Sequence, residues 1–178
     1  SLTCPSEAEY CEMVMNKTGG LFRLAIRLML TNSSIIKEYG PGASSLLIKL
    51  INLFGIIYQI KDDYLNLQNE NYEYNKGFCE DISEGKFSFL IIHAIQFNLN
   101  NKEVLNILKQ HTNDKALKRY MLSYMENVSN SFQYCEHTLK NLTVRAELLI
   151  KQIELAFSIS DNTITSDLYL ILNKLGSI

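Results

Sequence analysis

The stretch that decides the fold is Ala43–Leu67, ASSLLIKLINLFGIIYQIKDDYLNL. Its apolar residues lie on nearly every side of a helix, and a helix of that kind is usually buried in the core. The most apolar part is about 15 residues long and contains Lys49, so it is too short to span a bilayer and predicts no transmembrane segment. Two adjacent aspartates, Asp62 and Asp63, follow this apolar run, although burying a charge is costly.

A polar stripe runs along this expected helix and ends at the aspartates. At about 100° per residue, its members share one sector of the helix: Asn52, Gly55, Gln59, Asp62, Asp63 and Asn66. On a helix that is otherwise apolar, such a stripe predicts the wall of an internal cavity with a charged mouth. The alternative is a polar face turned to solvent. Asp62 and Asn66 could both offer oxygen atoms to a hard cation such as Mg²⁺.

Helical patterns fill the rest of the chain, and no alternation of apolar and polar residues predicts a sheet. We therefore expect an all-α protein. The other expected helices cover residues 4–17, 18–32, 102–110, 115–159 (as one helix or a pair) and 163–175.

Three segments are harder to assign. Residues 38–45, EYGPGASS, form a cluster of turn residues, so the long helix is expected to begin near Ala43. Residues 68–85 lack periodicity and predict a long loop, which is uncommon in a compact domain unless it is functional or disordered. Residues 86–98, KFSFLIIHAIQFN, predict a helix, but their β-branched apolar run also fits a buried strand.

Composition narrows the class of protein. A chain of 178 residues with 47% hydrophobic residues can build one core, so one domain is expected. The net charge is −2 and the 17 Lys and Arg residues form no long run, which argues against a nucleic-acid partner. The four cysteines lack CxxC spacing, so we expect neither a disulfide framework nor a zinc site, and a reducing, cytoplasmic location is favoured.

A glycine pair interrupts the helical pattern in MNKTGGLF. Gly19 and Gly20 each cost a helix about 1 kcal/mol relative to alanine, so a structural reason is expected. A kink there would leave backbone carbonyls unpaired on one side, and Lys17 and Thr18 could then bind a phosphate and present oxygen atoms to a cation. A simple helix–turn–helix explains the same pattern.

Two lysines, Lys76 and Lys86, lie in and just after the expected loop. Exposed lysines are usually just solvated. Next to a divalent cation and two carboxylates, however, their ammonium groups could close over a polyanion that the metal bridges.

Three motifs in this order and spacing, NKTGGLF, YQIKDDYLNL and KGFCEDISEGKFSF, resemble the later half of the trans-prenyltransferases. Among these, the motifs are most similar to the eukaryotic geranylgeranyl diphosphate synthases. The resemblance extends from CPSEAEY to TLKNL, which is most of the chain. It implies the isoprenoid-synthase helical bundle around a deep apolar cavity, with residues 1–178 as the C-terminal part of that single domain. It also implies a homo-oligomer.

The resemblance assigns roles to the residues singled out above. The predicted Mg²⁺ ligands are Asp62 and Asp63. The predicted diphosphate-binding residues are Lys17, Asn66, Lys76 and Lys86. The residues predicted to lie beside the developing carbocation are Thr18 and Gln59, which with Lys17 form the predicted catalytic set. The implied reaction condenses isopentenyl diphosphate with an allylic diphosphate, most simply farnesyl to geranylgeranyl diphosphate.

The sequence departs from that family in two places. Leu90 stands where the family often has proline, and we expect a local change in packing there. The first aspartate-rich motif, DDxxD, and the upstream basic residues that bind isopentenyl diphosphate do not occur in these residues. We therefore expect an N-terminal half in the same polypeptide, and this chain alone to be inactive.

Two other functions remain open. One is a catalytically inactive half-protein that acts as a dimerisation or regulatory subunit of a prenyl synthase, although Lys17, Asp62, Lys76 and Lys86 would then have no physical task. The other is a related terpene cyclase, which should work without isopentenyl diphosphate.

Overall fold

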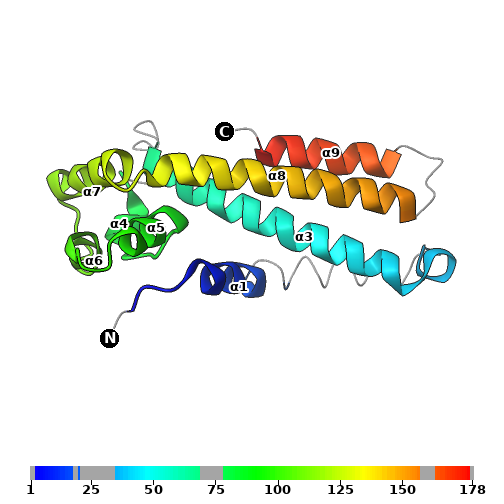
Figure 1. Cartoon of the computed structure of the whole chain (residues 1–178), viewed down its shortest axis with the longest axis horizontal. Helices are drawn as coiled ribbons and strands as arrows, with labels where there is room; N and C mark the ends of the chain where they lie inside the picture. Colours follow the sequence, from blue (N-terminus) through cyan, green and yellow to red (C-terminus); the bar gives the residue numbers. More distant parts are fainter. Residues whose placement is uncertain (1–2, 18–19, 21–34, 69–77, 157–162, 177–178) are drawn as a thin grey trace. The chain divides into compact units, whose positions relative to one another are not determined.

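The computed structural model of the chain describes residues 3–17, 20, 35–68, 78–156 and 163–176, and all regular structure in these ranges is helical (Figure 1). The all-α prediction is thus confirmed. The helices are α1 (Glu7–Lys17), α3 (Ile35–Gln68), α4 (Glu80–Ser83), α5 (Phe89–Phe97), α6 (Glu103–Leu108), α7 (Lys115–Asn127), α8 (Ser131–Ala156) and α9 (Thr163–Gly176).

The predicted turn at residues 38–45 is wrong. Helix α3 begins at Ile35 and runs for 34 residues through Gly40, Pro41 and Gly42. Turn residues lower helix propensity, but propensity is a weak prior that context overrides. The long apolar run that follows extends the helix past them.

The structure places a helix in each of the other uncertain segments. Residues 89–97 form α5, so the strand alternative for 86–98 is excluded. The expected long helix at 115–159 is the pair α7 and α8. The expected loop at 68–85 contains the short helix α4, which is too brief to show a period in the sequence. The helix predicted at 18–32 lies outside the described residues, except Gly20.

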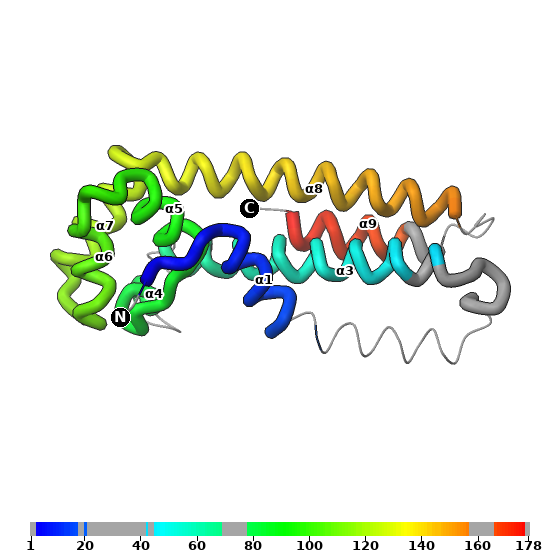
Figure 2. The backbone as a smooth tube through the Cα atoms, turned by 60° about the horizontal axis from the view of Figure 1, so that its bottom comes forward, coloured from blue at the N-terminus to red at the C-terminus, as the bar shows by residue number. Residues whose placement is uncertain are grey.

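The described residues divide into two compact units. The first unit comprises Ser1–Tyr10 and Ile60–Thr138. Its core is dominated by α5, whose residues Phe89, Leu90, Ile91 and Ile92 are all buried. The first turn of α5 is buried on every side and therefore needs partners around it, and Figure 2 shows α6 and α7 beside α5.

The second unit comprises Cys11–Gln59 and Leu139–Ile178. Here α9 lies alongside α8 in both views (Figures 1 and 2), with Gly176 close to Thr143. An apolar pocket of about 480 Å³ lies between α3 and α9. Its lining residues are Ile51, Phe54, Gly55, Tyr58, Leu168, Ile171 and Leu175.

Helices α1 and α7 each begin at a residue whose side chain caps the helix. Before α1, the Ser6 hydroxyl accepts from the Glu9 amide at 3.2 Å, while the Glu9 carboxylate accepts from the Ser6 amide at 2.7 Å. This reciprocal pair is a capping box. At α7, the Asp114 carboxylate accepts from the Ala116 amide at 2.7 Å. Each cap satisfies amide groups that the first turn of a helix leaves unpaired.

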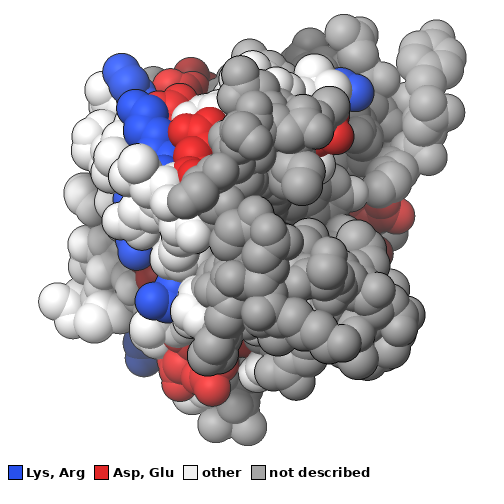
Figure 3. Space-filling model, turned by 90° about the vertical axis from the view of Figure 1, so that its right-hand side faces the viewer, with Lys and Arg blue, Asp and Glu red and all other residues white. Residues whose placement is uncertain are grey.

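The surface carries charges of both signs. Among the described residues visible in Figure 3, basic side chains lie close to acidic ones. Within the described ranges, no helix has both the length and the apolar character needed to cross a bilayer.

Gly85 ends α4 in a turn that only glycine fits well. The Lys86 amide donates to the Asp81 carbonyl at 2.9 Å and the Gly85 amide donates to the Ile82 carbonyl at 3.2 Å. These two bonds form a Schellman motif, which needs a left-handed residue at Gly85, where φ is 67°. A Cβ atom there would lie 2.3 Å from the ring of His111. The turn folds the chain back and places Lys86 over α4.

Replacing Gly85 by alanine should destabilise the protein. The left-handed backbone and the clash with His111 together should lower the free energy of unfolding by about 2 kcal/mol, measured by urea denaturation. Gly55→Ala is the matched control because Gly55 is helical and an added Cβ meets no atom within 4 Å. That control should raise the free energy of unfolding by about 0.5–1 kcal/mol. Equal effects of the two substitutions would contradict this account of Gly85.

Candidate functional site

The two adjacent aspartates of α3 lie in different environments. Asp63 is fully buried, on the stripe of α3 whose other members are Ile60, Tyr64 and Leu67. This is the i, i+3, i+4, i+7 spacing of a core-facing stripe. Asp62 is half-buried and shares the adjacent face of α3 with Gln59 and Asn66, which are also half-buried. The predicted polar stripe therefore has one member, Asp63, that belongs to the core.

Three donors hold the Asp63 carboxylate. Its Oδ2 accepts from the Tyr10 hydroxyl at 2.7 Å and from the Phe89 amide at 2.9 Å, and its Oδ1 accepts from Lys86 Nζ at 2.9 Å. Phe89 is the first residue of α5, whose N-cap Ser88 makes no side-chain cap. Asp63 thus caps α5 from outside, where a negative charge is favourable. The cost of burying this carboxylate is offset by its donors.

Lys86 is the centre of the polar cluster. Its Nζ lies 2.9 Å from Asp63 Oδ1 and 3.1 Å from Asp81 Oδ1, while its side chain remains 34% exposed. Burial by itself would lower the pKa of Lys86, but the two carboxylates outweigh burial and raise that pKa well above the ordinary value. Lys86 is therefore a permanent cation held in one place.

Asp81 is the second carboxylate on Lys86, and the sequence analysis did not identify it. Burial raises the pKa of Asp81 from 3.8 to about 6, against the opposing effect of the Lys86 ammonium group. The charge of Asp63 raises the same pKa further. The Asp81 carboxyl therefore takes up a proton more easily than an ordinary aspartate.

Asn66, predicted to bind diphosphate, caps α4 in the structure. Its Oδ1 accepts from the Asp81 amide at 3.2 Å. A helix of four residues cannot form without outside contacts, because helix nucleation is unfavourable. Asn66 therefore helps to place Asp81, and through it Lys86.

The remaining predicted site residues are Lys17, Thr18, Gln59 and Lys76. Lys17 is exposed at the end of α1, and Gln59 is half-buried on α3; both belong to the second unit. Thr18 and Lys76 lie outside the described residues. The roles predicted for these residues stay predictions.

Of the two predicted metal ligands, Asp62 is better suited than Asp63 to hold a metal ion. Within the described ranges, no three His, Cys, Asp or Glu side chains gather as a metal-binding group. Mg²⁺, however, keeps several waters and is often held by one or two carboxylates together with substrate phosphates. A half-buried carboxylate at Asp62 fits that chemistry, whereas the oxygens of Asp63 already accept three hydrogen bonds.

Sequence reasoning missed Tyr10 and Asp81. Tyr10 has no local signal, because it is 53 residues from its partner Asp63. Asp81 had one: the segment EDISEGK combines acidic residues with a glycine just after them, which is the signature of a short helix with a left-handed C-terminal turn. Read in that way, the segment predicts that Lys86 returns to Asp81.

Comparisons with known proteins agree with the motifs. The family model described as polyprenyl synthetase matches residues 1–125. A geranylgeranyl pyrophosphate synthase of Aspergillus flavus is 47% identical over 154 residues, which are 86% of this chain and 43% of that protein. One of Hypoxylon pulicicidum is 50% identical over 86% of this chain and 38% of its own length.

A third relative carries a different name. A copalyl diphosphate synthase of Talaromyces verruculosus is 49% identical over 86% of this chain, which is 15% of that protein. This chain thus spans less than half the length of each of these curated relatives.

Asp63→Asn should destabilise the protein far more than Asp62→Asn. The first substitution removes a buried charge from Lys86, Tyr10 and the end of α5, and should lower the free energy of unfolding by about 3–5 kcal/mol. The second alters a half-buried side chain and should cost about 1 kcal/mol or less. Urea denaturation of both variants measures the difference. Similar losses in the two variants would refute the separation of roles.

The Asp81 carboxyl should titrate near pH 6, as followed by NMR of labelled aspartate side chains. Its pKa is raised above the unfolded value, so between about pH 4 and pH 6 the native state binds the proton more tightly. The contribution of Asp81 to the free energy of unfolding therefore falls as pH rises through this window. Asp81→Asn should remove that part of the pH dependence. A titration midpoint at or below 3.8 would contradict the raised pKa.

Proposed function

This chain belongs to the polyprenyl synthetase family, and on that premise we propose that it works in a Mg²⁺-dependent prenyltransferase. The proposed reaction condenses isopentenyl diphosphate with an allylic diphosphate, farnesyl to geranylgeranyl diphosphate. The observation that carries this proposal is the ammonium group of Lys86, which Asp63 and Asp81 hold in place. The half-buried Asp62 adjoins Asp63 in the chain. The relatives named geranylgeranyl pyrophosphate synthases support the choice of product.

Lys86 has the properties of a residue that stabilises a departing diphosphate. When the allylic carbon–oxygen bond breaks, negative charge grows on the diphosphate, and a cation already in place stabilises that charge without reorganising. Two carboxylates fix the ammonium group of Lys86, and the 34% exposure of its side chain leaves it open to a ligand. In this proposal Asp63 and Asp81 orient Lys86, while Lys17, Asn66 and Lys76 bind the same diphosphate.

The proposal assigns the metal to Asp62, with Asp63 in support from the core. Mg²⁺, when bound, would neutralise charge on the diphosphate oxygens. Thr18 and Gln59 would lie beside the carbocation that ionisation leaves.

The activity needs groups that these residues lack. A second acidic motif and a site for isopentenyl diphosphate must come from further protein, in the same polypeptide or in a partner. The chain's share of its relatives' length, 43% in the first of them, supports the same polypeptide. A homo-oligomer in the cytoplasm, as inferred from the sequence, completes the proposal.

A terpene cyclase is the second candidate, favoured by the match to the copalyl diphosphate synthase. The two enzymes differ in one requirement. A prenyltransferase consumes isopentenyl diphosphate, whereas a cyclase acts on a single prenyl diphosphate.

The natural protein, purified intact, should convert farnesyl and isopentenyl diphosphates to geranylgeranyl diphosphate in the presence of Mg²⁺. Asp62→Ala and Lys86→Ala should each lower kcat/KM at least about 100-fold, since each removes a charge that acts on the leaving group. Lys109→Ala, on an exposed lysine, is the control and should leave the rate unchanged. The chain of 178 residues assayed by itself should be inactive. Product formed without isopentenyl diphosphate would favour the cyclase, and an inactive natural protein would favour the regulatory subunit.

A further inference from the structure

Lys118 occupies an unusual place for a lysine. It lies on the buried stripe of α7 with Met121, Tyr124 and Met125, and only 4% of it is exposed. Lysine is almost never fully buried unless it is paired. In the part of the chain that the structure describes, its ammonium group makes no ion pair. Burial accordingly lowers the pKa of Lys118.

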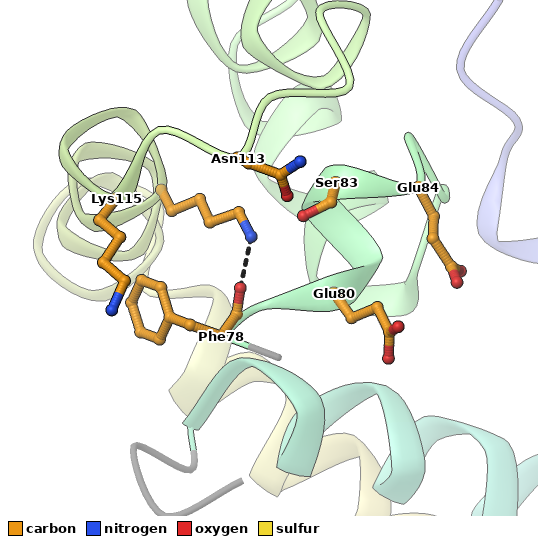
Figure 4. Close-up of a pocket in the computed structure, with 7 residues that line it drawn as sticks. Phe78, Glu80, Ser83, Glu84, Asn113 and Lys115 are labelled. Atoms are coloured by element: carbon orange, nitrogen blue, oxygen red, sulfur yellow. Dashed lines mark hydrogen bonds between the residues drawn. The ribbon is translucent and has the colours of Figure 1, made fainter. Parts of the chain in front are cut away.

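The partner of Lys118 is the backbone of Phe78. Its Nζ donates a hydrogen bond to the Phe78 carbonyl and lies 5.9 Å from the centre of the Phe78 ring. Figure 4 shows this bond beside a pocket of about 310 Å³, with the side chains of Glu80 and Glu84 directed away from the ammonium group. A methionine would fill the same space without a charge. The hydrogen bond to the Phe78 carbonyl therefore explains why a lysine occupies this buried position.

The residue after Phe78 explains why that carbonyl needs a strong donor. Cys79 is the N-cap of α4 and has a left-handed backbone, with φ 49° and ψ 59°. A side chain other than glycine is strained there, and such strain persists only where the surroundings hold it. Cys79 makes no side-chain cap to α4. The bond from Lys118 holds the backbone immediately before this strained turn.

We propose that Lys118 is a positioning residue: by binding the Phe78 carbonyl, it sets where α4 begins and so where Asp81 meets Lys86. Three contacts from outside then fix this short helix. Lys118 of α7 holds its entrance, Asn66 of α3 binds the Asp81 amide, and Lys86 binds the Asp81 carboxylate. The catalytic consequence rests on the proposed function, in which Lys86 binds the allylic diphosphate.

The first test is kinetic and uses the intact natural protein. Lys118→Met keeps the volume of the side chain and removes its donor, so α4 should shift and carry Asp81 away from Lys86. The KM for the allylic diphosphate should rise about tenfold, the effect of losing one charge-assisted hydrogen bond. The KM for isopentenyl diphosphate should not change, and kcat should change less than the allylic KM.

A matched control separates positioning from loss of stability. Met121→Ala removes a buried side chain one turn further along the same stripe of α7. It should lower the melting temperature at least as much as Lys118→Met and leave the allylic KM unchanged. Lys118→Gln keeps a neutral donor, so its KM for the allylic diphosphate should lie between those of the unmodified protein and Lys118→Met. This variant replaces Lys118→Met in the test if Lys118→Met does not fold.

The second test does not depend on catalysis. Amide hydrogen exchange in the chain of 178 residues reports on two amides that are hydrogen-bonded at opposite ends of α4. The Asp81 amide donates to Asn66 near the start of the helix, and the Lys86 amide donates to the Asp81 carbonyl after its end. Lys118→Met should speed exchange at these amides at least about tenfold relative to Met121→Ala, because local opening becomes easier. An inactive natural protein would contradict the proposed function, but the exchange measurement would still test the role of Lys118. Equal exchange rates at these amides in Lys118→Met and Met121→Ala would overturn the role of Lys118. So would an active Lys118→Met enzyme whose KM for the allylic diphosphate equals that of the unmodified protein.

Discussion

A carboxylate in the core has to be surrounded by donors, and this requirement organises the first unit. Asp63 receives hydrogen bonds from Tyr10 of α1, from the first amide of α5 and from Lys86, which follows α4. An unpaired charge in that place would cost several kcal/mol. The position of each partner is therefore tied to that of Asp63, and so is the direction in which the Lys86 ammonium group points.

The helix between these partners is too short to place itself. Four residues of α4 gain little from their own hydrogen bonds, so the contacts made by Lys118, Asn66 and Lys86 determine where it lies. The turn at Gly85 then returns the chain to the Asp81 carboxylate. Residues with no contact to a ligand thus control the geometry of a residue that has one in the proposed function.

The division of work between Asp62 and Asp63 follows from the helix period. Neighbouring residues differ by about 100° around the axis, so one aspartate of the pair faces the core and the other stays half-buried. A single aspartate could not both complete a buried ion pair and stay accessible to a cation. The proposed function uses this difference: Asp63 completes the buried ion pair with Lys86, and Asp62 is assigned to the metal.

The sequence by itself determined the all-α class, most helix positions and the motifs that identify the family, because helical periodicity and short motifs are local. It also contained the glycine signal of the turn before Lys86. It failed at residues 38–45, where the neighbouring apolar run extends the helix through turn residues. Only the tertiary structure decided that Asp63 is buried, that Tyr10 and Asp81 complete its cluster and that Lys118 holds Phe78. These contacts join residues up to 53 positions apart. They are selected because a buried charge or polar group without a partner is costly, and no local pattern records which distant residue becomes that partner.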